Sequence, residues 1–206
     1  MKKMFLLFCT IPLLFCGCQK QEPQTPMAQI QQTLTEMTGY TCIATLTRTS
    51  NKGETVYETK QDFKSTGEYR LELLAPDNVK GNYTVYDGKT VCQYNPHLQD
   101  KIVKDVSLSQ QRNELFLGQF LKNYMQSEGV SVETAALDES RCTVLEAVIA
   151  GNDPTMATEK LWIDNETLTP VRFVIYNTEY KPTWQLDYTA FSFNPHFDED
   201  LFAIPQ

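Results

Sequence analysis

A cysteine near the N-terminus, Cys18, is the residue whose type and surroundings point most directly to chemistry. Lys2 and Lys3 precede an apolar run over residues 4–15 that is too short to cross a bilayer comfortably, and Gly17 stands immediately before Cys18. This order is typical of a secretion signal that ends at a cysteine whose sulfur forms a thioether with diacylglycerol. We therefore expect Cys18 to be the lipidated first residue of the mature chain.

The segment resembles a bacterial lipobox, with one departure and two alternatives. Cys16 fits less well than Cys18 because bulky Phe15 precedes it, and Phe15 also stands where a leucine is usual. A cleaved secretory peptide or an uncleaved anchor would explain the same pattern without lipidation. On the lipobox interpretation, the chain comprises a signal peptide over residues 1–17, a lipidated tether over 18–26 and one domain over 27–206, held extracytoplasmically on a cell membrane.

Three further cysteines, Cys42, Cys92 and Cys142, stand in segments that have the pattern of strands. Buried free thiols are the favoured interpretation because a small apolar thiol packs well in a core, while one disulfide remains an alternative in an oxidising compartment. No C-x-x-C pair is present, and His97 and His196 are far from any cysteine in sequence. We therefore expect no metal site and no cofactor.

The sequence lacks the motifs of the common enzyme classes. It contains no G-x-S-x-G elbow, no H-E-x-x-H helix, no phosphate-binding Walker loop and no glycine-rich dinucleotide turn. Asp198, Glu199 and Asp200 could offer carboxylates to a cation, but a solvated acidic run explains them as well. We predict that the chain has no catalytic residues and is not an enzyme.

The charge balance limits the partners. The chain has 18 basic and 26 acidic side chains and a formal net charge of -8, and loss of Lys2 and Lys3 with a signal peptide would make it more negative. Phosphate backbones and anionic lipid head groups would repel such a surface. Nucleic acid is therefore not an expected partner, and a membrane would be reached through the diacylglyceryl anchor.

The patterns along the chain predict two helices and many antiparallel strands. One helix is expected over residues 27–38, where Thr25 can cap it, Pro26 suits its first turn and Gly39 can end it. A second is expected around the apolar stripe of residues 117–125, with Asn113 as its candidate cap and Gly129 as its stop. Strands are expected over residues 40–49, 54–65, 69–74, 83–86, 89–94, 101–103, 141–149, 158–163, 170–176 and 183–191.

Several of these segments are similar, in the same order, to those of the lipoprotein-carrier family (LolA, LolB and RseB-like domains). They include Asp87-Gly88 and its flanking strands, the strand-turn-strand run over residues 161–171 with Trp162 and Pro170, and the closing run over residues 194–205. The resemblance covers about residues 27–205. It implies a mainly β (α+β) fold, an incomplete antiparallel half-barrel of about eleven strands with helices on the concave face. Trp162, Phe173 and Phe191 are expected in its core or cavity.

Within that family, the short lipidated germination lipoproteins of the GerS type are the most similar. The resemblance implies a non-enzymatic protein that binds a spore-cortex N-acetylmuramoyl-L-alanine amidase of the CwlD type and enables its activity. It also implies the forespore envelope as an alternative to the cell membrane. The alternative is a carrier or receptor for lipids or acylated lipoproteins, since a half-barrel can hold acyl chains through apolar contact. A homodimer formed through free strand edges is a further expected partner arrangement.

Overall fold

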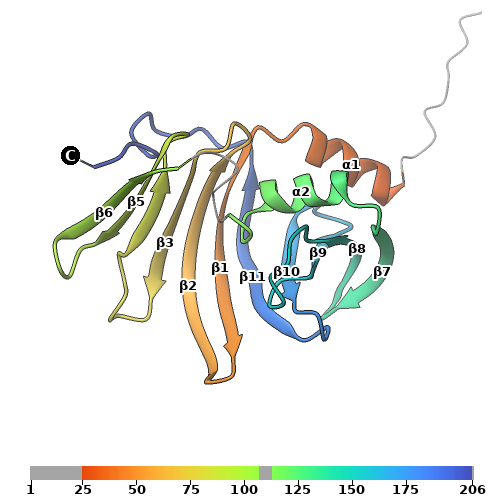
Figure 1. Ribbon diagram of the computed structural model, residues 1–206. Helices are drawn as coiled ribbons and strands as arrows, with labels where there is room; N and C mark the ends of the chain where they lie inside the picture. The colour runs from red at the N-terminus through yellow and green to blue at the C-terminus, as the bar shows by residue number, and fades with distance from the viewer. Residues whose placement is uncertain (1–24, 107–112, 206) are drawn as a thin grey trace, which may run out of the picture.

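One strongly curved antiparallel sheet forms most of the molecule (Figure 1). The computed structural model describes residues 25–106 and 113–205. Its eleven strands follow the order β6-β5-β4-β3-β2-β1-β11-β10-β9-β8-β7. They are β1 Gly39–Ser50, β2 Gly53–Lys64, β3 Tyr69–Ala75, β4 Tyr83–Tyr86, β5 Thr90–Asn95, β6 Asp100–Asp105, β7 Ser131–Leu137, β8 Ser140–Val148, β9 Thr158–Asp164, β10 Pro170–Tyr176 and β11 Pro182–Phe193. The sheet does not close, so the predicted half-barrel is confirmed.

The centre of the sheet joins the two ends of the domain. β1 pairs with β2 on one side and with β11 on the other, so the first and last strands lie next to each other. Along β1, Tyr40, Cys42, Ala44 and Leu46 are buried in the main core, as the two-residue period of a strand requires. The strands on both sides of this centre curl toward the same, concave face (Figure 1).

Helix α1, Pro26–Thr35, begins where the sequence predicts and ends earlier. The Thr25 hydroxyl accepts a hydrogen bond from the Ala28 N–H at 3.3 Å, and Pro26 is the first helical residue. The predicted extension to residue 38 is wrong, because the backbone at Thr38 hydrogen-bonds to the Asn194 side chain instead of continuing the helix. The Asn194 Oδ1 accepts the Thr38 N–H at 2.7 Å, and Gly39 is already the first residue of β1.

Helix α2, Leu117–Gln126, lies inside the curve of the sheet and contacts β8 (Figure 1). The helix packs closely on the sheet, as the Gly118 position shows: a Cβ added there would overlap the Phe63 ring. The predicted cap and stop are both wrong. Phe116, not Asn113, is the N-cap residue and makes no side-chain capping bond. The helix ends at Gln126 with Ser127 as its C-cap, before Gly129 is reached.

The predicted strands are confirmed within two residues at each end, but the sequence missed one strand. β7 contains Glu133 and two alanines, which are depleted in strands, so it gives little local signal. Its pairing with β8, residue Ser131 opposite Glu146, decides its conformation. The predicted hairpin turn at Asp87-Gly88 is confirmed, with Gly88 at a φ of 99°.

The predicted core placement of the three aromatic residues is correct for two of them. Phe173 is fully buried in the main core and Phe191 packs partly buried against it. Trp162 is only half-buried. Strand alternation places it on the face opposite to Leu161 and Ile163, both of which belong to the core.

A smaller core lies on the convex side, where the C-terminal segment crosses the β4–β5 hairpin. Val85 of β4, Cys92 of β5 and Phe202 are its buried members. The Lys101 ammonium group donates to the Pro205 carbonyl oxygen at 2.7 Å, which ties the end of this segment to β6. The C-terminal residues therefore cover the back of the β3–β6 half of the sheet.

Candidate functional site: an open cavity on the concave face

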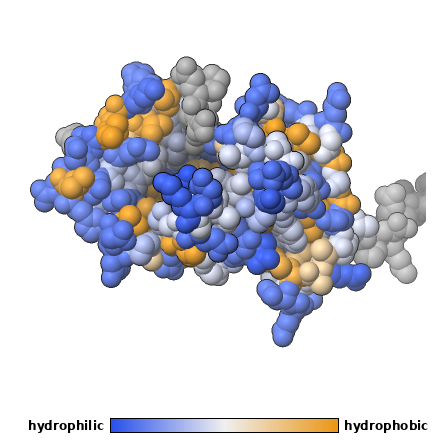
Figure 2. Space-filling view, turned by 60° about the horizontal axis from the view of Figure 1, so that its bottom comes forward, coloured by the Kyte–Doolittle hydropathy of each residue, from blue (hydrophilic) through white to orange (hydrophobic). Residues whose placement is uncertain are grey.

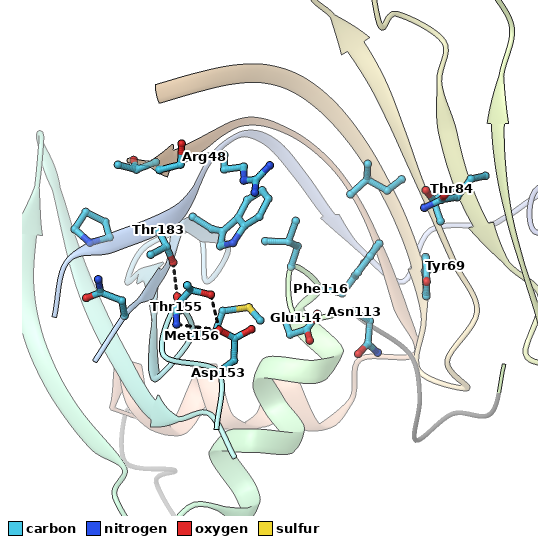
Figure 3. A pocket seen from close by; sticks show the side chains of 18 of the residues that line it. Arg48, Tyr69, Thr84, Asn113, Glu114, Phe116, Asp153, Thr155, Met156 and Thr183 are labelled. Carbon is cyan, nitrogen blue, oxygen red and sulfur yellow. Dashed lines mark hydrogen bonds between the residues drawn. The ribbon is translucent and has the colours of Figure 1, made fainter. Parts of the chain in front are cut away.

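A hollow with a volume of about 1170 Å³ lies on the concave face beside the start of α2. Figure 2 looks at the end of the molecule onto which it opens, and shows mostly hydrophilic residues around the opening. One wall comes from strands β3 to β6. The opposite wall comes from residues 153–156 and 177–184, and residues 113–116 cross between them (Figure 3).

Apolar side chains form the inner part of this cavity. Tyr69 and Leu71 of β3 line it from the sheet, Phe116 from the segment before α2, and Met156 from the opposite wall. The Tyr69 and Phe116 rings contact each other with centroids 4.6 Å apart. Burial raises the pKa of Tyr69 to about 12, so this phenol remains neutral at physiological pH. The inner surface can therefore hold an apolar group.

Charged and polar side chains surround that apolar part. The Arg48 guanidinium lies over the Trp184 ring, 5.1 Å from its centroid, and thus covers one face of the indole. On the opposite wall, Thr155 donates to Asp153 at 2.7 Å and Thr183 donates to the Thr155 carbonyl at 2.8 Å (Figure 3). Further charged residues of the lining are Lys104, Glu114, Glu179 and Lys181. A ligand of this cavity would meet both signs of charge at the opening.

A buried polar contact fixes the segment that crosses the cavity. The Tyr40 hydroxyl accepts the Leu117 N–H at 3.1 Å and donates to the Gln61 Oε1 at 3.1 Å, while the Gln61 amide donates to the Leu115 carbonyl at 3.4 Å. Burial raises the pKa of Tyr40 well above its ordinary value, so its proton stays available for this bond. Tyr40 thereby satisfies an N-terminal N–H of α2 that no cap residue reaches.

A second buried polar pair holds the C-terminal half of α2. The Asn123 amide donates to the Glu159 Oε1 at 2.8 Å, and Gln119 donates to the Asn123 Oδ1 at 2.9 Å. Glu159 has no exposed surface, and its Oε2 has no hydrogen-bond partner among the described residues. Burial raises the pKa of this carboxyl group from 4.5 to about 7, and the nearby Glu114 adds to the rise.

The residues that the sequence singled out do not meet in this cavity. Cys18, the predicted lipidation site, lies outside the described residues. Cys42, Cys92 and Cys142 are buried free thiols, as favoured, and their pKa values are raised by burial. His97 lies in the turn between β5 and β6. Asp198, Glu199 and Asp200 are solvent-exposed.

Residues 25–106 and 113–205 contain neither a metal-binding cluster nor a membrane-spanning helix. No group of three or more His, Cys, Asp or Glu side chains in this part of the chain is arranged to hold a metal ion. Neither α1 nor α2 has the length and apolar character that a membrane-crossing helix needs.

Comparison with known proteins assigns the chain to a family. A family model described as sporulation protein YdcC-like matches residues 1–202. The chain belongs to this family. The sporulation protein YdcC of Bacillus subtilis (strain 168) is 20% identical over 204 residues, which are 98% of this chain and 60% of that protein. This YdcC-like chain thus spans less than two thirds of the length of the curated relative that it matches.

Solved structures share the half-barrel fold. An uncharacterized conserved protein from Thermus thermophilus has a TM-score of 0.56 at 18% identity, over 86% of this chain and 93% of that one. A chain in the structure of the CwlD amidase from Clostridioides difficile in complex with the GerS lipoprotein has a TM-score of 0.51 at 26% identity, over 85% of this chain and 99% of that one. The predicted resemblance to a GerS-related protein is confirmed.

Sequence reasoning did not find the residues that line the cavity. The sequence of the loop that holds Asp153, Thr155 and Met156 indicates only a turn. Thr183 and Trp184 lie at the start of β11, far from that loop and from β3 in sequence. In β2, Tyr57, Thr59 and Gln61 share a face that is not wholly apolar, but none of these residues lines the cavity. Such a face is compatible with a wet hollow but does not say which loops complete it.

Proposed function

We propose that this YdcC-like protein is an extracytoplasmic sporulation lipoprotein, anchored through Cys18, that binds a cell-wall amidase of the CwlD type and enables its activity without being catalytic itself. The single observation that carries the proposal is the match to a chain of the GerS–CwlD complex at 26% identity, over 99% of that chain. Membership of a sporulation-protein family supports a role in sporulation.

An acyl anchor is consistent with this role. A protein that is tethered to a membrane acts on partners within reach of its tether, and it raises their local concentration there. The polar segment over residues 19–26 would provide such a tether between the lipid and α1. The folded domain would then be concentrated near the membrane, where an amidase acting on the adjacent peptidoglycan could bind it.

The cavity supports a second candidate, a carrier or receptor for lipids or acylated proteins. Its volume of about 1170 Å³ and its inner residues Tyr69, Leu71 and Phe116 could accommodate an acyl chain. Arg48, Lys104 and Glu114 also line it, and an acyl chain would have to desolvate such charged groups without pairing them. This lining favours the amidase-binding role over the carrier role.

One experiment separates the two candidates. The purified full-length protein in detergent is mixed with the CwlD-type amidase of its host, and complex formation and cleavage of cortex peptidoglycan are measured. We expect a complex at micromolar concentration and higher amidase activity, both unchanged in a Leu71→Gln variant whose cavity is more polar. Bound lipid in native mass spectra, lost in Leu71→Gln, together with no amidase complex, would show a carrier instead.

A further inference from the structure

The open sheet leaves two edge strands, β6 and β7, at opposite ends (Figure 1). Each pairs with one neighbour among the described residues, β6 with β5 and β7 with β8. In an edge strand, backbone N–H and C=O groups on the outer side are free to pair with another chain. The two edges differ in the side chains that would permit or prevent such pairing.

β6 carries features that oppose pairing. Asp100, Lys101, Lys104 and Asp105 give it four charges in six residues, and lysines on an edge are a common protection against strand addition. The C-terminal segment also reaches this strand, since Lys101 donates to the Pro205 carbonyl oxygen. An incoming strand would have to accommodate charges along the whole length of β6.

β7 lacks these features. Its seven residues contain no lysine, arginine, proline or glycine. Its one charged residue is Glu133, whose Oε1 lies 3.1 Å from the Lys160 ammonium group of β9. Lys160 also lies 3.3 Å from the Glu146 carboxylate of β8, so one lysine links the three outer strands and holds β7 in place. The edge is thus fixed in position and open along its outer side.

The surroundings of β7 indicate what it would pair with. Val130 and Val132, 42% and 48% exposed, give the beginning of this edge an apolar surface. Exposed acidic residues stand beyond both ends, with Glu128 before the strand and Asp138 and Glu139 in the turn after it. A complementary strand would carry small or apolar residues in its middle and basic residues near its ends.

We propose that β7 is the edge to which the amidase adds an extended segment, apolar in its middle and basic at its ends, as an additional antiparallel or parallel strand. This inference rests on the proposed function and assigns it a surface. Strand addition supplies affinity through main-chain hydrogen bonds, while Val132 and the flanking carboxylates supply selectivity. β6, with its four charges, does not take part.

Matched lysine substitutions at the two edges test the assignment in the full-length protein with the host's CwlD-type amidase. Val132→Lys places a charge on β7 and should weaken the complex about tenfold or more, because a lysine on an edge resists strand addition. Val103→Lys places the same charge on β6, at a position that is 47% exposed, and should leave affinity within about twofold. Circular dichroism and thermal unfolding of both variants check that the fold is kept.

Two further measurements make the test independent of these variants. Amide hydrogen exchange over residues 131–137 should slow when the amidase is added, while exchange over residues 100–105 stays unchanged. Glu128→Lys combined with Glu139→Lys should weaken the complex and reduce its dependence on salt, because a basic partner loses two opposite charges. Tighter binding of this double variant would contradict the charge assignment.

The remaining outcomes separate this inference from the proposed function. A complex that forms equally well with Val132→Lys, without protection of residues 131–137, would overturn the β7 assignment and leave the amidase role standing. The absence of any complex with the unaltered protein would overturn both. Concentration-dependent protection of β7 in the amidase-free protein would mean that a second copy of this chain occupies the edge, and this also contradicts the inference.

Discussion

At the scale of single residues, α2 is held to the sheet by two buried polar contacts, one at each end of the helix. Tyr40 and Gln61 bind the backbone at its beginning, and Glu159 binds Asn123 near its end. A buried polar group is costly when a partner is missing, so each contact specifies where the helix must sit. The position of Phe116 in the cavity depends on these contacts.

Glu159 makes the stability of the domain depend on pH. Its pKa in the folded protein is about 7, above the ordinary value of 4.5, so the folded state binds the proton more tightly than the unfolded state. The stabilisation by the protonated form is complete below about pH 4.5 and is lost as the pH rises through about 7, by about 3 kcal/mol. Glu159→Gln should therefore be more stable than the unaltered protein at pH 8 and similar to it at pH 4.5.

Urea unfolding at several pH values between 4.5 and 8 measures this difference. Glu128→Gln is the matched control, because Glu128 is exposed and its substitution should leave the pH dependence unchanged. The same loss of stability with rising pH in Glu159→Gln would contradict the role of this carboxyl group.

Tyr40→Phe tests the contact at the other end of α2. The substitution removes the hydroxyl group that accepts the Leu117 N–H and donates to Gln61, and it leaves both buried groups without that partner. We expect a loss of about 1–3 kcal/mol in the free energy of unfolding. Tyr124→Phe, at a partly exposed position on α2, should change stability by less than about 0.5 kcal/mol. Equal effects of the two substitutions would show that the Tyr40 hydroxyl is dispensable.

At the scale of elements, the close contact between α2 and β2 leaves no room for a side chain at Gly118. Gly118→Ala would place a Cβ against the Phe63 ring with overlap, so the helix or the ring must move. We expect a loss of about 1–3 kcal/mol in the free energy of unfolding, although alanine favours helices more than glycine does. Lys122→Ala, an exposed position on the same helix, is the control for helix propensity. A more stable Gly118→Ala protein, measured by thermal unfolding, would rule out this close packing.

At the scale of the whole molecule, the position of the protein in the cell depends on Cys18. Cys18→Ala should abolish labelling by a fatty-acid analogue and leave the precursor uncleaved, because the thiol is the group that would receive the diacylglycerol. Cys16→Ala is the matched control and should be labelled normally. Unchanged labelling of Cys18→Ala would contradict the anchor and leave the folded domain without its proposed tether.

Local sequence signals determined most of the elements. The alternation of residues in β1 and β2, the Asp87-Gly88 turn and the Pro26 start of α1 all depend on neighbours close in the chain, and all are found as predicted. β7 and the end of α1 could not be predicted in this way. Their conformation depends on pairing with β8 and on Asn194, which lies 156 residues from Thr38.

The sequence by itself determined the fold class, the family resemblance and the lipobox-like signal at Cys18, because each follows from residue types and their order along the chain. It favoured burial of the three thiols but left a disulfide open, and the structure shows all three free and buried. Only the tertiary structure decided which residues form the cavity, why α2 stays on the sheet and which strands form the two edges of the sheet. Those features arise where segments far apart in the chain meet, such as Asn123 with Glu159 and Arg48 with Trp184. Contacts of that kind are set by the curvature and register of the sheet, which no local pattern encodes.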